Sequence, residues 1–206
     1  MLRIRACASD DLEALYAISL ATGDRGGDAS ALYRDPRLMG AIYSAPYALL
    51  EPELAFVAED ADGVAGFAVG TCDTRAFEDR LAAEWRPRLR AGTSPPDPAR
   101  ADRWTADERR LHQIHTPTPT PDWVVAAHPA HLHVNLLPRL QGRGVGARLA
   151  DRWTASAAAR GARALHAGVN AHNTRALSFW RRQGFAEIDP ARRDGRTVWL
   201  GRRLAP

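Results

Sequence analysis

The chain has 206 residues, of which 45% are hydrophobic, so residues 1–206 can form one domain with a sizeable core. Its net charge is +4 and every cation is arginine, which we attribute to GC-rich codon bias, because no basic tract with interleaved aromatic residues predicts nucleic-acid binding. No apolar run approaches the roughly 20 residues of a membrane span, and Cys7 and Cys72 form neither a disulfide framework nor a metal motif, so we expect a reduced, cytoplasmic protein without a membrane partner.

The first third of the chain mixes strand and helix patterns. Helical periodicity begins near Asp10, with Leu12, Leu15 and Ile18 on one face. A second helical region, interrupted by its prolines, covers residues 29–50. Alternating hydrophobicity predicts strands at residues 2–6, 54–59 and 64–71.

In the last third of the chain, the sequence predicts a regular alternation of strands and helices. Gly161 closes a helix that starts near Gly144, and Asn173 is a good N-cap for a helix that ends at Gly184. The final two strands form an antiparallel pair around Asp194 and Gly195. The predicted strands lie at residues 132–136, 164–169, 185–188 and 197–200.

A segment of about 55 residues, 74–128, separates the third predicted strand from the fourth, and a segment of this length is expected to have structure of its own. Residues 77–90 and 102–114 are predicted to be helical, and the proline-rich segment 116–121 is predicted to be extended. The tryptophans in the two helices indicate packing, whereas the position of the segment in a loop indicates a wall or lid over a binding site. Both interpretations can hold.

A glycine-rich turn, Gln141-Gly-Arg-Gly-Val-Gly146, lies between a predicted strand and a predicted helix. Glycine lets the backbone approach a ligand closely because it has no Cβ. The N-terminus of the following helix offers unpaired N–H groups and the positive end of its dipole, which suits a phosphate. Arg143 and Arg148 add positive charge. The turn therefore predicts a phosphorylated cofactor, although a helix-capping loop without a ligand would have the same sequence.

Two common nucleotide-binding patterns match poorly. A P-loop needs Lys-Ser or Lys-Thr after its last glycine, and Ala147-Arg148 stand there. The dinucleotide fingerprint would need Ala147 as its third member after Gly142 and Gly144, and no acidic residue follows at the usual spacing. A dehydrogenase that binds NAD is therefore disfavoured.

The motif Gln141-x-x-Gly144-x-Gly146, after a strand and Pro138, resembles the pyrophosphate-binding motif of the GNAT acetyltransferase superfamily. The helix that starts at Asn173 and ends at Gly184-Phe185 resembles the second half of that signature. The resemblance implies an α/β (α+β) GNAT fold, in which helices flank a central, mixed and mostly antiparallel sheet. The family usually joins its third and fourth strands by a short turn, so segment 74–128 is a helical insertion.

A closer resemblance covers nearly the whole chain. Residues 70–77, Trp85-x-Pro87 and residues 198–204 are similar to the acetyltransferase-like C-terminal domain of animal O-GlcNAcases. This implies a free-standing relative of bacterial type that retains the glycine turn. The animal domain also implies that the architecture can persist without evident catalysis.

The GNAT resemblance implies acetyl-CoA as the cofactor, with its pyrophosphate on the amides of residues 142–147. The pantetheine arm would add to the strand that ends at Leu136 and Leu137, where an amide N–H would polarise the thioester carbonyl. Asn173 would hydrogen-bond the arm, or would serve only as an N-cap. The implied cofactor-binding residues are Leu136, Leu137, Gln141, Gly142, Arg143, Gly144, Val145, Gly146, Ala147, Asn173, Ala176 and Trp180.

The implied acceptor is a small-molecule or peptidyl amine, which attacks only when neutral, so a base must take its proton. His133 and Asn135 share one strand face with His131, and His133 titrates in the useful range. The same residues can instead form a partly buried polar face, and we expect no metal site among them. Asp73 is a candidate for substrate contact or a cap of the next helix.

Trp180 stands where GNAT enzymes commonly have a tyrosine that assists the departing thiolate. Indole has no proton of useful acidity, which weakens catalysis without forbidding it. Two hypotheses follow: an N-acetyltransferase that is a monomer or homodimer, with Asp73, His133, Asn135 and Trp180 as candidate catalytic residues, or a non-catalytic acyl-CoA-binding module.

Overall fold

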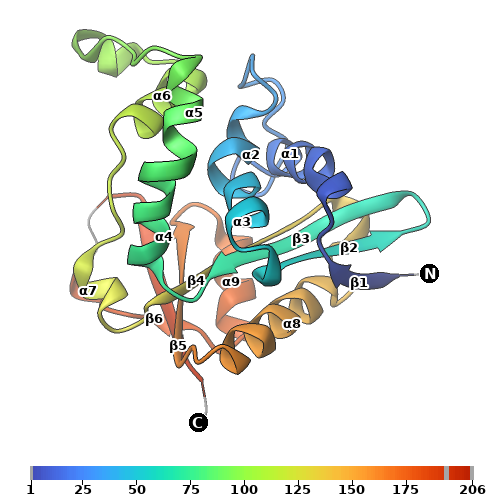
Figure 1. Ribbon diagram of the computed structural model, residues 1–206. Coiled ribbons are helices and arrows are strands. Elements are labelled where there is room, and N and C mark those ends of the chain that lie inside the picture. Colours follow the sequence, from blue (N-terminus) through green and yellow to red (C-terminus); the bar gives the residue numbers. More distant parts are fainter. Residues whose placement is uncertain (1, 193–194, 205–206) are drawn as a thin grey trace.

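The computed structural model of the protein describes residues 2–192 and 195–204, which contain one seven-stranded sheet with the strand order β1-β2-β3-β4-β5-β7-β6 (Figure 1). Neighbouring strands are antiparallel except for β4 and β5, which are parallel. This confirms the expected mixed, mostly antiparallel sheet. The strands are β1 (Arg3–Ala6), β2 (Ala55–Asp60), β3 (Gly63–Thr71), β4 (Ala130–Leu136), β5 (Ala164–Asn170), β6 (Ala186–Glu187) and β7 (Thr197–Arg203).

The last two strands differ in detail from expectation. β7 continues beyond residues 197–200 because it pairs with β5 along its whole length, up to Arg203. β6 and β7 are antiparallel, as expected. The turn between β6 and β7 was expected around Asp194 and Gly195. Gly195 has a φ of 73°, and Asp194 lies outside the described residues.

Helices cover both faces of the sheet, because successive side chains of each strand point to opposite sides (Figure 1). Val57 packs with Leu15 on one face, and Phe56 packs with Trp153 on the other. None of the helices in the described residues is long and apolar enough to span a membrane. The helices outside the insertion are α1 (Leu12–Ala21), α2 (Leu38–Tyr43), α3 (Ala45–Leu50), α8 (Val145–Ala159) and α9 (Thr174–Arg182). Short 3₁₀ turns occupy Ser9–Asp11, Pro52–Leu54, Pro98–Arg103, Pro138–Leu140 and Pro190–Arg192.

The expected helical region at residues 29–50 is only partly helical. Within this region no helix forms before Leu38, two residues after Pro36, and Ser44 (φ −141°) separates α2 from α3. Pro46 stands in the first turn of α3, where its missing N–H has no helical partner to lose.

The helical insertion between β3 and β4 is present. Its helices pack against α2, because Trp85 is buried and its Nε1–H donates to the Ala41 carbonyl at 2.8 Å. The Asp107 carboxylate also accepts from the backbone N–H of Arg34 at 3.2 Å. The packing interpretation therefore holds for Trp85, whereas Trp104 precedes α6 and packs against His112 within the insertion. The insertion contains α4 (Thr74–Arg80), a π-helical turn (Leu81–Trp85), α5 (Arg86–Ala91), α6 (Ala106–His115) and α7 (Asp122–Val125).

β4 and β5 separate after a short ladder. Their only paired residues are Ala130 with Leu165 and His131 with His166. Toward its C-terminal end β4 therefore has a partner, β3, on one side only. The main chain of β4 on its other side is left open to a ligand.

The backbones of β3 and β4 approach each other closely at Gly70, and a substitution there tests whether this approach is required. A Cβ at this position would lie 2.1 Å from the His131 carbonyl oxygen and 2.7 Å from Cζ2 of Trp153. Gly70→Ala is expected to lower the free energy of unfolding by about 1–3 kcal/mol, because backbone or a buried ring must move. The measurement is urea denaturation. The control is Gly92→Ala, whose Cβ would meet nothing within 4 Å, and equal destabilisation by both substitutions would contradict this account.

Candidate active site

The glycine turn leaves a row of backbone donors unpaired. Gly142 (φ 71°) and Gly144 (φ 74°) adopt the left-handed conformation, and Gly144 is the N-cap of α8. The first helical hydrogen bond runs from the Arg148 N–H to the Gly144 carbonyl. In the described part of the chain, no protein group accepts from the N–H groups of residues 142–147. Unpaired donors at the positive end of a helix are suited to an anion.

These donors face a cavity of about 470 Å³, which we call the glycine-turn cavity. Arg175 and Arg182 line it, and no Asp or Glu does among the described residues. Its lining residues are Thr22, Gly26, Val134, Leu136, Gln141, Gly142, Gly144, Gly146, Ala147, Asn173, Arg175, Ala176, Phe179, Trp180, Arg182 and Gln183.

Arg175 is held in place by two hydrogen bonds. Its Nη1–H donates to Oε1 of Gln141 at 2.6 Å, and its Nη2–H donates to the Gly26 carbonyl at 2.9 Å. Nε2 of Gln141 in turn donates to the Leu136 carbonyl at 2.7 Å. Sequence reasoning missed Arg175, although its place in the first turn of the helix that Asn173 opens was a usable signal.

Most of the expected cofactor-binding residues line the glycine-turn cavity, but three do not. Arg143 is exposed and donates to the Arg139 carbonyl at 3.3 Å, and the Val145 side chain is fully buried, so that residue offers only its N–H. Leu137 is directed elsewhere, because its N–H donates to the Ala65 carbonyl of β3 at 2.8 Å. The N–H of Val134 and that of Leu136 face the open side instead, since residues alternate along a strand.

Asn173 and Trp180 both lie in the wall of this cavity. The Oδ1 atom of Asn173 accepts from the Ala176 N–H at 3.0 Å, so Asn173 is an N-cap whose Nδ2 remains available as a donor. Trp180 is 6% exposed and packs against Phe179 and Phe185. Its indole N–H has no acceptor among the residues that the structure describes.

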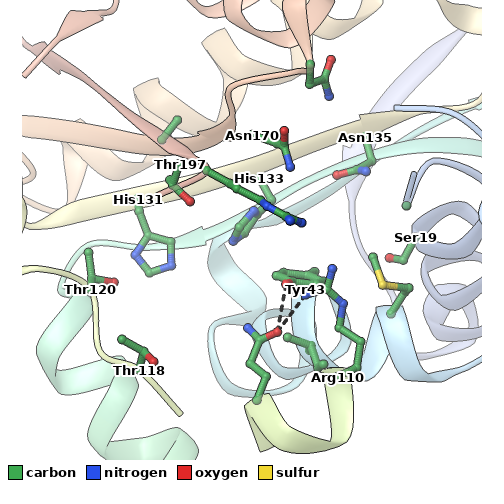
Figure 2. Close-up of a pocket in the computed structure, with 18 of the residues that line it drawn as sticks. Ser19, Tyr43, Arg110, Thr118, Thr120, His131, His133, Asn135, Asn170 and Thr197 are labelled. Atoms are coloured by element: carbon green, nitrogen blue, oxygen red, sulfur yellow. Dashed lines mark hydrogen bonds between the residues drawn. The ribbon is translucent and has the colours of Figure 1, made fainter. Parts of the chain in front are cut away.

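A second and larger cavity, of about 1230 Å³, adjoins the first. His131, His133 and Asn135 of β4 line one side, and Tyr43 and Arg110 lie across from them, as Figure 2 shows. We call it the histidine cavity. Residues of the insertion form part of its wall, so the wall interpretation of the insertion is supported as well. Thr22, Gly26 and Asn173 line both cavities, which therefore lie side by side.

A chain of hydrogen bonds determines the tautomer of each histidine on β4. The Thr74 hydroxyl donates to the Pro129 carbonyl at 2.6 Å, so the contact of 2.7 Å between its oxygen and Nδ1 of His131 needs a proton on that nitrogen. Nε2 of His131 then accepts from the Tyr47 hydroxyl at 2.8 Å. The Tyr47 oxygen in turn accepts from Nε2–H of His133 at 3.2 Å. The lone pair of His133 is therefore on Nδ1.

Burial keeps this chain uncharged at neutral pH. Burial, reinforced by His166 and His133, holds the pKa of His131 well below its usual range. Burial lowers the pKa of His133, and separately that of His166, to about 4. Burial also raises the pKa of Tyr47, so its hydroxyl keeps its proton. His133 is therefore neutral near pH 7, and the expectation that it titrates in the neutral range was wrong, because burial lowers its pKa to about 4.

The other two candidate catalytic residues have different roles. Asn135 donates from Nδ2 to the Thr22 hydroxyl at 2.6 Å, which fixes its amide beside the cavity. Asp73 is exposed, does not line the histidine cavity, and accepts from the Ala76 N–H at 3.1 Å as the N-cap of α4. The expected substrate contact of Asp73 is thus not supported, whereas the alternative, a helix cap, is what the structure shows.

Both the sequence and the fold of this chain match known proteins. The sequence model of the acetyltransferase (GNAT) family matches residues 28–185. The chain is also similar to SsHAT, a crystal structure with 37% sequence identity over 100% of this chain and 99% of that one, at a TM-score of 0.88. The chain belongs to the GNAT acetyltransferase family. The expected GNAT fold is confirmed.

More distant GNAT structures share the fold. One is yncA from Salmonella typhimurium, solved with its cofactor acetyl-CoA, with 15% identity, coverage of 100% of this chain and 95% of that one, and a TM-score of 0.53. Another is the PaiA N-acetyltransferase from Thermoplasma acidophilum in complex with coenzyme A, with 14% identity, coverage of 99% of each chain and a TM-score of 0.58.

The buried histidines predict acid sensitivity. A histidine with a folded pKa of about 4, such as His166, and an unfolded pKa of about 6.5 binds its proton only in the unfolded state between these values. Its stabilising contribution is therefore complete above about pH 6.5 and falls by up to about 1.4 kcal/mol per pH unit toward pH 4. Urea denaturation between pH 7 and 5 measures this slope. His166→Phe should reduce it and His172→Phe, at an exposed position, should not; equal slopes in both variants would refute the assignment.

Proposed function

We propose that the protein is an N-acetyltransferase that moves an acetyl group from acetyl-CoA to an amine, with residues 1–206 as one catalytic domain. The observation that carries the proposal is the row of unpaired N–H groups at residues 142–147, continuous with the open edge of β4. When bound, acetyl-CoA supplies an acetyl thioester that an amine can attack.

The glycine-turn cavity fits the cofactor chemically. The amides of residues 142–147, with Arg175 and Arg182 nearby, offer donors and positive charge to a pyrophosphate. Val134 and Leu136 offer strand amides to an extended arm, and Nδ2 of Asn173 adds a side-chain donor. A backbone N–H aimed at the thioester carbonyl would stabilise developing negative charge, and losing such a donor costs roughly 3 kcal/mol in comparable sites.

His133 is the proposed base. If an amine attacked the acetyl thioester, so that an N–C bond formed as the C–S bond broke, the lone pair on Nδ1 of His133 would take the amine proton. The Nε2–H of His133 donates to Tyr47 before and after this transfer, so its hydrogen bond is kept. Thr74, His131 and Tyr47 act as positioning residues, since they fix which nitrogen is basic.

Trp180 supports a second candidate. It has an N–H donor but no dissociable proton of useful acidity, so the thiolate, whose pKa is about 8.5 for a free thiol, leaves without a general acid. A non-catalytic acyl-CoA-binding module would keep the glycine turn without needing such a group. The proposed kinship with the acetyltransferase-like domain of O-GlcNAcases favours the same alternative.

Gly144→Asp tests the cofactor site. The substitution places a carboxylate at the proposed phosphates and a Cβ on a residue with a φ of 74°. We expect the affinity for coenzyme A to fall by about a hundredfold or more, which is roughly 3 kcal/mol. Isothermal titration calorimetry measures this. Gly63→Asp is the control, because Gly63 has a φ of 96° in the exposed turn after β2. Unchanged affinity in Gly144→Asp would remove the cofactor assignment.

Thiol release from acetyl-CoA in the presence of amines tests catalysis. His133→Gln is expected to lower kcat by about a hundredfold or more, and Tyr47→Phe by about tenfold, because the tautomer is no longer fixed. Calorimetry should show unchanged acetyl-CoA affinity in both variants, and His112→Gln, outside both cavities, should retain full activity. A wild-type protein that binds acetyl-CoA but releases no thiol above hydrolysis would favour the module, and full activity of His133→Gln would exclude this base.

A further inference from the structure

The histidine cavity carries an excess of positive charge. Its only lining carboxylates among the described residues are Asp24, which pairs with Arg25 at 3.1 Å, and Glu78, which pairs with Arg75 outside the cavity lining. The lining arginines are Arg25, Arg86, Arg109, Arg110 and Arg196. Within the part of the chain that the structure describes, most of the guanidinium charge in the wall therefore has no ion-pair partner.

Arg110 of α6 is held in place entirely by neutral groups. Its Nε–H donates to the Tyr33 hydroxyl at 3.1 Å, and Nη1 donates to the Tyr43 hydroxyl at 2.8 Å and to Oε1 of Gln113 at 3.0 Å. The two N–H groups of Nη2 have no protein acceptor, and no carboxylate forms an ion pair with Arg110, within the described ranges. This side chain is an oriented cation with free N–H donors on Nη2. Such a donor can make a charge-assisted hydrogen bond to one oxygen of a carboxylate or phosphate.

Arg86 is a second cation of the same cavity. Its side chain is partly buried and makes no hydrogen bond or ion pair to the described part of the chain. Burial and then the neighbouring Arg90 lower its pKa, and the attraction of Glu78 offsets them only in part. An anionic ligand would offset the electrostatic cost of this partly buried charge.

The positive wall lies close to the proposed base. The guanidinium carbon of Arg110 is 5.4 Å from the centre of the Tyr43 ring, and that ring is 6.1 Å from the ring of His133. One small molecule can therefore reach both. The same positive field disfavours an ammonium group and so favours the neutral, nucleophilic amine. A polycationic acceptor would be repelled.

We propose that the acceptor is an amine that also carries an anionic group, a carboxylate or a phosphate, which Arg110 binds with support from Arg86 while the amine faces His133. This inference rests on the proposed acetyl transfer and adds the class of its acceptor.

The test compares matched amines by kcat/KM for thiol release. Each common amino acid is paired with its carboxamide, glucosamine 6-phosphate is paired with glucosamine, and spermidine represents polycations. We expect at least one anionic amine to exceed its uncharged partner by about ten- to a hundredfold, the worth of a hydrogen bond to a charged group. Whether the carboxylate or the phosphate pair shows the preference identifies the anion.

Arg110→Gln should abolish the preference, and Arg86→Gln should reduce it, which provides a second variant if the first does not fold. Arg103→Gln is the control, because Arg103 is exposed, pairs with Asp102 and does not line the cavity. A wild-type protein that acetylates uncharged or polycationic amines equally well, with no effect of Arg110→Gln, would overturn this inference and leave the proposed function standing.

If acetyl-CoA binds but no amine accelerates thiol release, the proposed function fails instead. Calorimetric binding of the same matched pairs to the coenzyme A-loaded protein then decides the inference separately. Binding that is selective for the anionic member and is lost in Arg110→Gln supports an anionic ligand for this cavity. Equal binding of both members overturns it.

Discussion

The site depends on one constraint of the sheet: β4 and β5 pair over two residues and then part. Each has a complete partner on its far side, β3 for β4 and β7 for β5, so the sheet remains whole while a gap opens at its middle. The open edge of β4 leads to the glycine turn, where α8 begins with unpaired N–H groups. Backbone donors, which need no particular side chain, thus form a continuous surface for an extended, anionic ligand.

The two cavities divide the chemistry between backbone and side chains. The glycine-turn cavity offers mainly amides and lies against α9, whereas the histidine cavity offers imidazoles, hydroxyls and guanidinium groups. The insertion supplies Arg86 and Arg110 to the second cavity, and the buried Trp85 anchors it to α2. The same segment therefore both packs and shapes the site. Variation in such a segment can change the acceptor without disturbing cofactor binding.

Sequence reasoning located the elements well and the side-chain partners poorly. The glycine turn, the Asn173 cap and the insertion were all predictable, because each depends on residues close together in the chain. Leu137 was expected to line the cofactor site, but its N–H faces β3, and Val134 lines the glycine-turn cavity instead. The sequence showed that alternate residues of the strand face opposite sides, but it did not show which side of β4 is open. The expected helical region at residues 29–50 was only partly helical; an interruption by proline was expected, whereas the break at Ser44 was not.

The sequence by itself determined the order of strands and helices, the positive-φ glycines at the mouth of α8 and the caps of α4 and α9, because dihedral preference and short-range hydrogen bonds encode them. Only the tertiary structure decided that Tyr47 bridges two histidines 84 and 86 residues away and that Arg175 reaches Gly26 across 149 residues. It also decided that Arg110 has no acidic partner among the described residues. These features arise from packing between distant segments, and no local pattern of residues records which side chains packing will bring together.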